Sequence, residues 1–174
     1  LNDEMTSEPV NALVFAAQLN HRELQLVKAW CAYVLQIDRS MTRSGLSGVL
    51  LSCPAQVRVL LEFFRSRFAS GTVQESDVMR SFEELRSSQE DGVFRALWNV
   101  IRATVRTNFF LGRTEITFKV ASAGLPGLAR PVPLFEIFVY ARDFEGIHLR
   151  GGRVARGGIR WSDRPDDFRT EIHG

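Results

Sequence analysis

Two Arg-Gly-Gly triplets lie close together near the C-terminal end of the sequence. The second triplet is followed two residues later by another arginine, so that residues 156–160 read Arg-Gly-Gly-Ile-Arg. Glycine lets a ligand approach the main chain closely, and a guanidinium group can hold a carboxylate or a phosphate through two parallel hydrogen bonds. This combination predicts a site that binds an anionic group.

The spacing of the arginines indicates how such a site would be built. If residues 156–162 are extended, Arg156, Gly158 and Arg160 share one face of the strand, with the two arginine Cα atoms about 13 Å apart. Long side chains at that separation could converge on the two ends of a dicarboxylate. The alternative is a bulged strand whose arginines pair with the acids that follow in 163–167. The spacing alone favours neither interpretation.

Other chemistries fit this region poorly. Residues 151–158 lack the Gly-Lys-Ser/Thr of a P-loop and the glycine spacing of a dinucleotide-binding turn. His148 has the chemistry of a base, but a histidine on one face of a strand is more often structural. The triplets also resemble the RGG elements of RNA-binding tails, which are long and disordered, whereas strand-forming aliphatic residues surround these two. An RNA-binding arm is therefore the least favoured function.

The residues before the second triplet have the pattern of a sheet. Residues 115–120 alternate in polarity as a strand does. In 135–140 only Glu136 is charged, which predicts a strand inside a sheet and covered on both faces. Gly151-Gly152 suits a two-residue hairpin turn, with 153–156 as the returning strand.

The earlier part of the sequence has helical periodicity. Asn20 and Glu23 have the spacing of a capping box ahead of a helix over about 21–37. Pro54 fits the first turn of a helix over about 54–69. Residues 40–48 are predicted as a loop or a weak helix start. Two further helices are expected, over about 75–87 and, after a polar break at 88–92, from 93 to about 108.

Composition and order together predict an α+β protein. Of 174 residues, 45% are hydrophobic and 24% are charged, which is sufficient for a real core. The net charge of +2 gives no strong field toward nucleic acid or an acidic membrane surface, and no apolar run approaches membrane-spanning length. We expect neither partner. The predicted parts are a linker or frayed segment at 1–20, a helical domain at 21–111 and a β-rich, truncated domain at 112–174.

Cysteine usage and the two ends of the sequence suggest where the protein works and what it is part of. Cys31 and Cys53 lie in apolar helical patterns, which favours free thiols in a reducing cytoplasm, and no Cys/His cluster predicts a metal site. The sequence begins at Leu1 and stops at Gly174, shortly after an expected helix start near Pro165. We expect both ends to be cuts through a longer polypeptide.

Longer strings around the glycines resemble the large bacterial NAD-specific glutamate dehydrogenases. The similarity is tight over 133–171, where it includes Phe135-Glu-Ile-Phe-Val-Tyr140 and Val154-Ala-Arg-Gly-Gly-Ile-Arg-Trp-Ser-Asp-Arg164, and it is diffuse before residue 95. The resemblance implies the end of a helical region and the start of an α/β substrate domain. It also implies oxidative deamination of L-glutamate to 2-oxoglutarate and ammonia, with NAD as the hydride acceptor.

The resemblance also assigns roles to individual residues. In smaller glutamate dehydrogenases, a Lys-Gly-Gly-x-Arg element opens the substrate-binding region, and its lysine contacts the side-chain carboxylate of the substrate. Residues 156–160 are similar, with arginine in the place of that lysine. The resemblance therefore implies that Arg156 and the main chain of Gly157 and Gly158 bind substrate, with Arg160 in support.

The family's catalytic and NAD-binding residues would follow Gly174, and the sequence has no lysine after Lys119. We therefore expect no catalytic, NAD-binding or metal-binding residue within these 174 residues, and no activity from them alone. The full-length protein is expected to be a homo-oligomer. The competing hypothesis is a non-catalytic oligomerisation or regulatory module built from the helices of 21–110.

Overall fold

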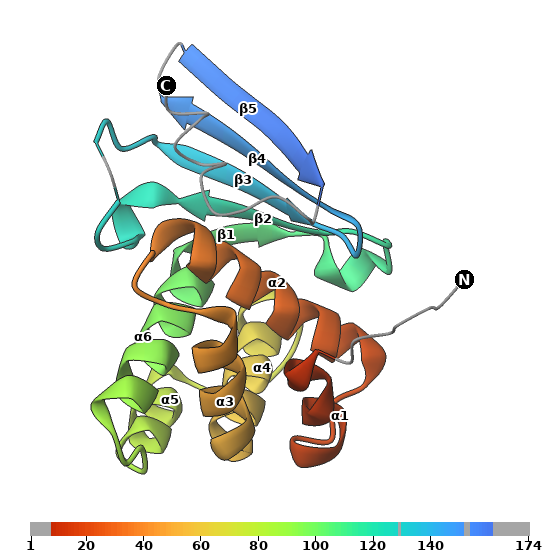
Figure 1. Cartoon of the computed structure of the whole chain (residues 1–174), viewed down its shortest axis with the longest axis vertical. Coiled ribbons are helices and arrows are strands. Elements are labelled where there is room, and N and C mark those ends of the chain that lie inside the picture. Colours follow the sequence, from red (N-terminus) through yellow and green to blue (C-terminus); the bar gives the residue numbers. More distant parts are fainter. Residues whose placement is uncertain (1–7, 129, 152–153, 162–174) are drawn as a thin grey trace.

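The computed structural model describes residues 8–128, 130–151 and 154–161 of the chain. Helices form one layer and an antiparallel sheet forms the other (Figure 1). The predicted α+β class is confirmed. Within the described part, no helix alone has the length and apolarity to cross a bilayer; α3 and α4 reach them only when counted together, with a 95° bend between them.

The helical layer contains six α-helices among the described residues, joined by short turns. Their bounds are α1 Leu13–Ala16, α2 His21–Ile37, α3 Arg43–Ser52, α4 Pro54–Phe68, α5 Glu75–Phe82 and α6 Ser88–Ala103. Three 3-10 turns accompany them: η1 Pro9–Ala12, η2 Phe109–Leu111 and η3 Ser122–Gly124.

Local chemistry fixes several helix starts. The predicted capping box of α2 is confirmed, because the main-chain N–H of Glu23 donates to Asn20 Oδ1 at 2.9 Å and that of Asn20 donates to Glu23 Oε2 at 2.8 Å. Pro54 opens α4 as predicted. Of the two options for residues 40–48, the helix start is correct, since Thr42 Oγ1 accepts a hydrogen bond from the N–H of Gly45 and caps α3.

Two predictions in the region of α6 are wrong. The polar stretch 88–92 is not a break: Ser87 Oγ accepts a hydrogen bond from the N–H of Glu90 and caps the helix, so these polar residues form its first turn. The helix also ends at Ala103 rather than near Asn108. The β-branched residues Thr104 and Val105 begin a strand instead, although their apolar pattern continues that of the helix.

The sheet has five strands in the described part of the chain, each antiparallel to the next in chain order. They are β1 Thr104–Thr107, β2 Ile116–Ala121, β3 Phe135–Tyr140, β4 Phe144–Gly151 and β5 Val154–Trp161. Gly151 pairs with Val154, so residues 152 and 153 form the link between β4 and β5. The predicted turn at Gly151-Gly152 falls on this link, and residues 152 and 153 lie outside the described residues.

One face of the sheet packs on the helices. The Phe138 ring of β3 lies 5.0 Å from the Tyr33 ring of α2, and the Phe118 ring of β2 lies 6.4 Å from the Phe64 ring of α4, measured between centroids. A single core cluster includes residues of both layers. It runs across the predicted domain boundary at 111/112, which stays a prediction.

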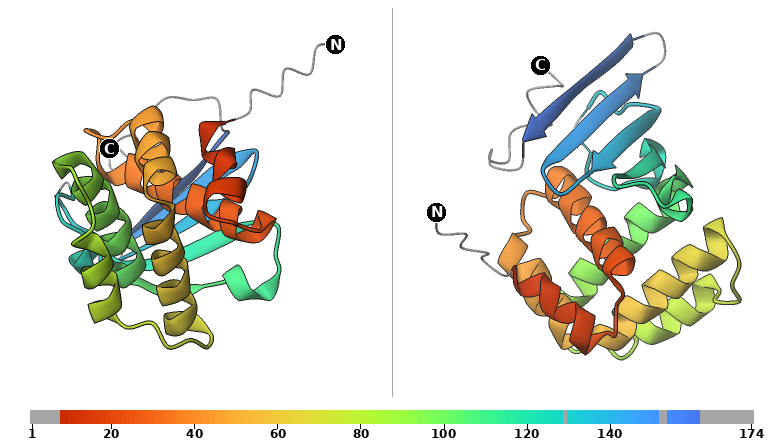
Figure 2. Two further views of the ribbon diagram at one scale, coloured as in Figure 1. Left: turned by 90° about the horizontal axis from the view of Figure 1, so that it is seen from below. Right: turned by 90° about the vertical axis from the view of Figure 1, so that its right-hand side faces the viewer.

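The second face of the sheet has no described helix over it (Figure 2). Phe135, Ile137 and Val139 of β3 lie on this face and are half-buried. The expectation that this strand is covered on both faces is therefore not met within the described residues, where the helices cover one face only. We call the second face the open face.

Candidate functional site

The predicted anion-binding residues lie on β5, which pairs on one side only among the described residues. Figure 1 shows it as the strand farthest from the helices. Its register with β4 places Arg156 opposite Leu149, Gly157 opposite His148 and Gly158 opposite Ile147. Directly opposed residues of an antiparallel pair share a face of the sheet. Positions 156, 158 and 160 therefore alternate with Gly157 and share a face, as the spacing predicted.

Gly157 has a structural reason to be glycine that is independent of any ligand. A Cβ atom added there would lie 3.0 Å from the carbonyl oxygen of Ile147 and 3.1 Å from Cδ2 of His148. The first of these atoms belongs to the main chain of the neighbouring strand and cannot turn aside. A side chain at position 157 would therefore push β5 away from β4.

Three glycines leave a hollow where the two strands meet. Gly146, Gly157 and Gly158 line a cavity of about 470 Å³ together with side chains that include Val139 and His148. Nδ1 of His148 is buried and accepts or donates no hydrogen bond within the described part of the chain. A ligand in this hollow would reach the main chain of both glycines of the predicted motif.

The structure does not bring the arginine and the hollow together. Arg156 is exposed, and the register places it on the face of Leu149, whereas Gly157 and the hollow belong to the open face. Position 160 lies opposite Glu145, a buried acid that accepts a hydrogen bond from Gln36 Nε2 at 2.8 Å. Arg156 and Gly157 thus lie on opposite faces of one strand, whereas position 158 shares the face of Arg156.

A second hollow of about 720 Å³ occupies the other end of the open face. Arg106, Lys119 and Arg150 line it, and it shares His148 with the first hollow. Nζ of Lys119 lies 4.3 Å from the centroid of the Phe135 ring, within the range of a cation–π interaction. No carboxylate is among the described residues that line this hollow, so its electrostatics also suit an anion.

Sequence reasoning missed this second group of cations. They come from β1, β2 and β4, and no local motif connects residues so far apart. Alternation along each strand combined with the strand order would have placed Lys119 and Arg150 on one face. The order of strands was the missing information.

A metal centre finds no support in the described residues, where no three His, Cys, Asp or Glu side chains are grouped to hold an ion. Both cysteines are free thiols, at Cys31 and Cys53.

Two family models together match most of the chain. The model described as "Glutamate dehydrogenase, helical motif 3" matches residues 5–70. The model described as "Bacterial NAD-glutamate dehydrogenase, catalytic domain" matches residues 77–174. The second match contains α6, the whole sheet and the Arg-Gly-Gly-Ile-Arg motif.

Curated proteins named NAD-specific glutamate dehydrogenase show the same relationship. The protein of Halomonas elongata is 37% identical over 98% of this chain, that of Pseudomonas aeruginosa 34% over 100%, and that of Mycobacterium tuberculosis 38% over 94%. The chain spans 12% of the length of the first two and 11% of the third. With its catalytic-domain match, this chain belongs to the bacterial NAD-glutamate dehydrogenase family.

Proposed function

We propose that these 174 residues work as part of an NAD-dependent glutamate dehydrogenase, which converts L-glutamate to 2-oxoglutarate and ammonia. The observation that carries this proposal is the position of the Arg-Gly-Gly-Ile-Arg motif inside the catalytic-domain match. Arg156 is exposed, and it lies on β5, which pairs on one side only among the described residues. A substrate that enters between this sheet and another part of the enzyme would meet this strand first.

In this proposal the residues of β5 bind and orient the substrate. The guanidinium of Arg156 holds the side-chain carboxylate of glutamate through two parallel hydrogen bonds. The main chain of Gly157 and Gly158 limits how the substrate lies against the strand, and Arg160 supports the site. With its side-chain carboxylate fixed, glutamate presents its α-carbon for hydride transfer, and NAD, bound outside these residues, supplies the acceptor.

The proposal extends to the state of the protein in the cell. We place the enzyme in the cytoplasm as a homo-oligomer, without a nucleic-acid or membrane partner. The free thiols of Cys31 and Cys53 support a reducing location.

Replacing Arg156 by alanine in the full-length enzyme tests the proposed substrate contact. We expect the KM for glutamate to rise by about 10- to 100-fold, because a hydrogen-bonded charge contributes roughly 1.5–3 kcal/mol. We expect kcat to change much less, since the lost contact holds substrate and transition state alike. Steady-state kinetics with varied glutamate and saturating NAD measure both quantities.

Two further variants complete this test. Arg156→Lys keeps the positive charge but lacks the planar guanidinium group. Its KM for glutamate should lie between those of wild type and Arg156→Ala. Arg142→Ala removes an exposed arginine from the turn between β3 and β4 and should leave the KM unchanged. An unchanged KM in Arg156→Ala would remove that residue from the substrate site.

A further inference from the structure

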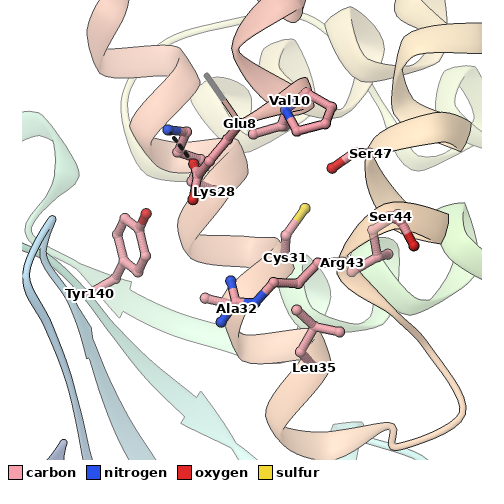
Figure 3. A pocket seen from close by; sticks show the side chains of 12 residues that line it. Glu8, Val10, Lys28, Cys31, Ala32, Leu35, Arg43, Ser44, Ser47 and Tyr140 are labelled. Atoms are coloured by element: carbon pink, nitrogen blue, oxygen red, sulfur yellow. Dashed lines mark ion pairs between the residues drawn. The ribbon is translucent and has the colours of Figure 1, made fainter. Parts of the chain in front are cut away.

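A separate cavity lies at the junction of the helical layer and the sheet. It has a volume of about 300 Å³ and is enclosed by η1, α2, α3 and the end of β3 (Figure 3). Cys31 and Arg43 belong to the segment that matches the helical motif, whereas Tyr140 belongs to the segment that matches the catalytic domain. The cavity thus joins two parts of the family's architecture.

The interior of this cavity is apolar. Val10, Cys31, Ala32 and Leu35 line it. Burial raises the pKa of the Cys31 thiol to about 12. At neutral pH the thiol is therefore protonated and only weakly polar. The volume corresponds to roughly ten water molecules, which is room for a compact ligand.

The mouth of the cavity has one positive charge in excess. Nζ of Lys28 pairs with Oε2 of Glu8 at 2.7 Å, so these two charges compensate each other. Arg43 makes no ion pair within the described part of the chain, and its side chain lies along the cavity beside Cys31 and Ala32 (Figure 3). Its charge opposes the effect of burial on the pKa of both Cys31 and Tyr140.

Two hydroxyl groups add hydrogen-bonding capacity near this charge. Tyr140 and Ser47 line the cavity, and neither side chain makes a hydrogen bond to another described residue. A few convergent polar groups over an apolar floor are the usual composition of a small-molecule site. The lone guanidinium selects the polar part of the ligand, since its planar fork matches a carboxylate.

We propose that this cavity binds a small organic monocarboxylate, with the carboxylate on Arg43 and a compact apolar body against Cys31 and Leu35. The one uncompensated cation, Arg43, can neutralise one carboxylate. The apolar floor has no charged group to pair with a second carboxylate. The site would therefore reject glutamate and 2-oxoglutarate, which carry two. The inference does not rest on the function proposed for β5.

Occupancy of this cavity would link the helical layer to the sheet. The ligand would contact α2 and α3 on one side and Tyr140 of β3 on the other, and β3 is central in the sheet that carries β5. A ligand that binds only when both layers are in place stabilises their contact. The cavity is thus placed to influence how the sheet that carries β5 sits on the helices.

Ligand-observed saturation-transfer NMR on the full-length enzyme tests the proposal, with isovalerate as the probe and saturating 2-oxoglutarate in every sample. Isovalerate has one carboxylate and a branched apolar body. We expect a saturable signal from it, and at least tenfold weaker binding of acetate, which lacks the body, and of isoamyl alcohol, which lacks the charge.

Two variants locate the binding. Arg43→Met should weaken isovalerate binding at least tenfold, and Ser47→Leu should abolish it by filling the cavity. Arg80→Met, at a 75% exposed side chain on α5, and Gly48→Leu, at an exposed position of α3 with open space around it, are the matched controls and should bind as wild type does. Circular dichroism establishes that each variant is folded.

The proposal fails if folded wild-type enzyme gives no saturable isovalerate signal, which would also be the result if another part of the chain fills the cavity. Equal affinity in wild type, Arg43→Met and Ser47→Leu would likewise overturn it. Neither outcome bears on Arg156, because that site is occupied or absent to the same degree in every sample.

Discussion

Two buried acids of the sheet receive hydrogen bonds from one helix. The hydroxyl of Tyr33 donates to Oε2 of Glu136 at 2.6 Å, and Nε2 of Gln36 donates to Oε2 of Glu145 at 2.8 Å. A buried carboxylate without donors is strongly destabilising, so these contacts favour the observed alignment of α2 on β3 and β4. The polar pairs therefore add to the apolar packing in fixing how the helix lies on the sheet.

Tyr33→Phe removes one of these donors and retains the ring. We expect the free energy of unfolding of the 174-residue chain to fall by about 1.5–3 kcal/mol, since Glu136 stays buried with one partner fewer. Urea denaturation followed by circular dichroism measures the change. Tyr140→Phe is the matched control, because its hydroxyl bonds to no other described residue, and it should change stability by less than about 0.5 kcal/mol.

Individual roles were predictable from the sequence only where they depend on near neighbours. The helix predicted over 21–37 is confirmed, and its Trp30 and Tyr33 are almost fully buried. Glu136 stood out as the single charge in its strand, but its partner lies 103 residues away in the chain. The requirement for glycine at 157 likewise depends on the neighbouring strand, which no local pattern reveals.

At the scale of elements, one carboxylate connects two helices. Glu23 caps α2, and its Oε1 also accepts hydrogen bonds from Arg58 and Arg65 of α4. Glu62 binds the same two arginines, but its side chain is 39% exposed, whereas that of Glu23 is 5% exposed. The two acids share both arginines, but only Glu23 is buried and caps a helix.

Glu23→Ala and Glu62→Ala therefore form a matched pair. We expect Glu23→Ala to lower the free energy of unfolding by about 2 kcal/mol or more, because it leaves the capped N–H and the inner donors without an acceptor. Glu62→Ala should cost less than about 1 kcal/mol, as an exposed ion pair does. Thermal or urea denaturation of both variants in parallel measures the two changes in the free energy of unfolding. Equal decreases would show that the burial of Glu23 is unimportant.

Element boundaries show why periodicity is an incomplete guide. Helices α2 and α4 were predicted to within about a residue, because a capping box and an N-terminal proline mark their starts. The start of α6 was missed because its polar first turn resembles a loop. Its end was missed because Thr104 and Val105 continue the apolar pattern while forming a strand, so only pairing with β2 determines the change.

For the whole molecule, the described chain is a helical layer against one face of a sheet, and it spans about 12% of its relatives' length. Two surfaces have no covering element among the described residues. They are the open face, with its half-buried Phe135, Ile137 and Val139, and the outer edge of β5. Fold class was predictable because it follows from element order. The order of elements does not determine what covers the open face.

The purified 174-residue chain should therefore have no dehydrogenase activity. We expect no glutamate-dependent formation of NADH, followed by absorbance at high protein concentration, and negligible NAD binding by calorimetry. The physical reason is that hydride transfer needs a nicotinamide held against the substrate, which we assign to the rest of the enzyme. Measurable turnover would contradict the proposal that the catalytic residues and the NAD site lie outside these 174 residues.

The chain-order pairing of the strands has a consequence for synthesis on the ribosome. Each strand from β2 to β5 joins a neighbour that was translated immediately before it, so the sheet can assemble one hairpin at a time as the polypeptide emerges. The helices that shield its first strands are made earlier still. Among the described strands, the last to arrive is β5, which bears the Arg-Gly-Gly-Ile-Arg motif.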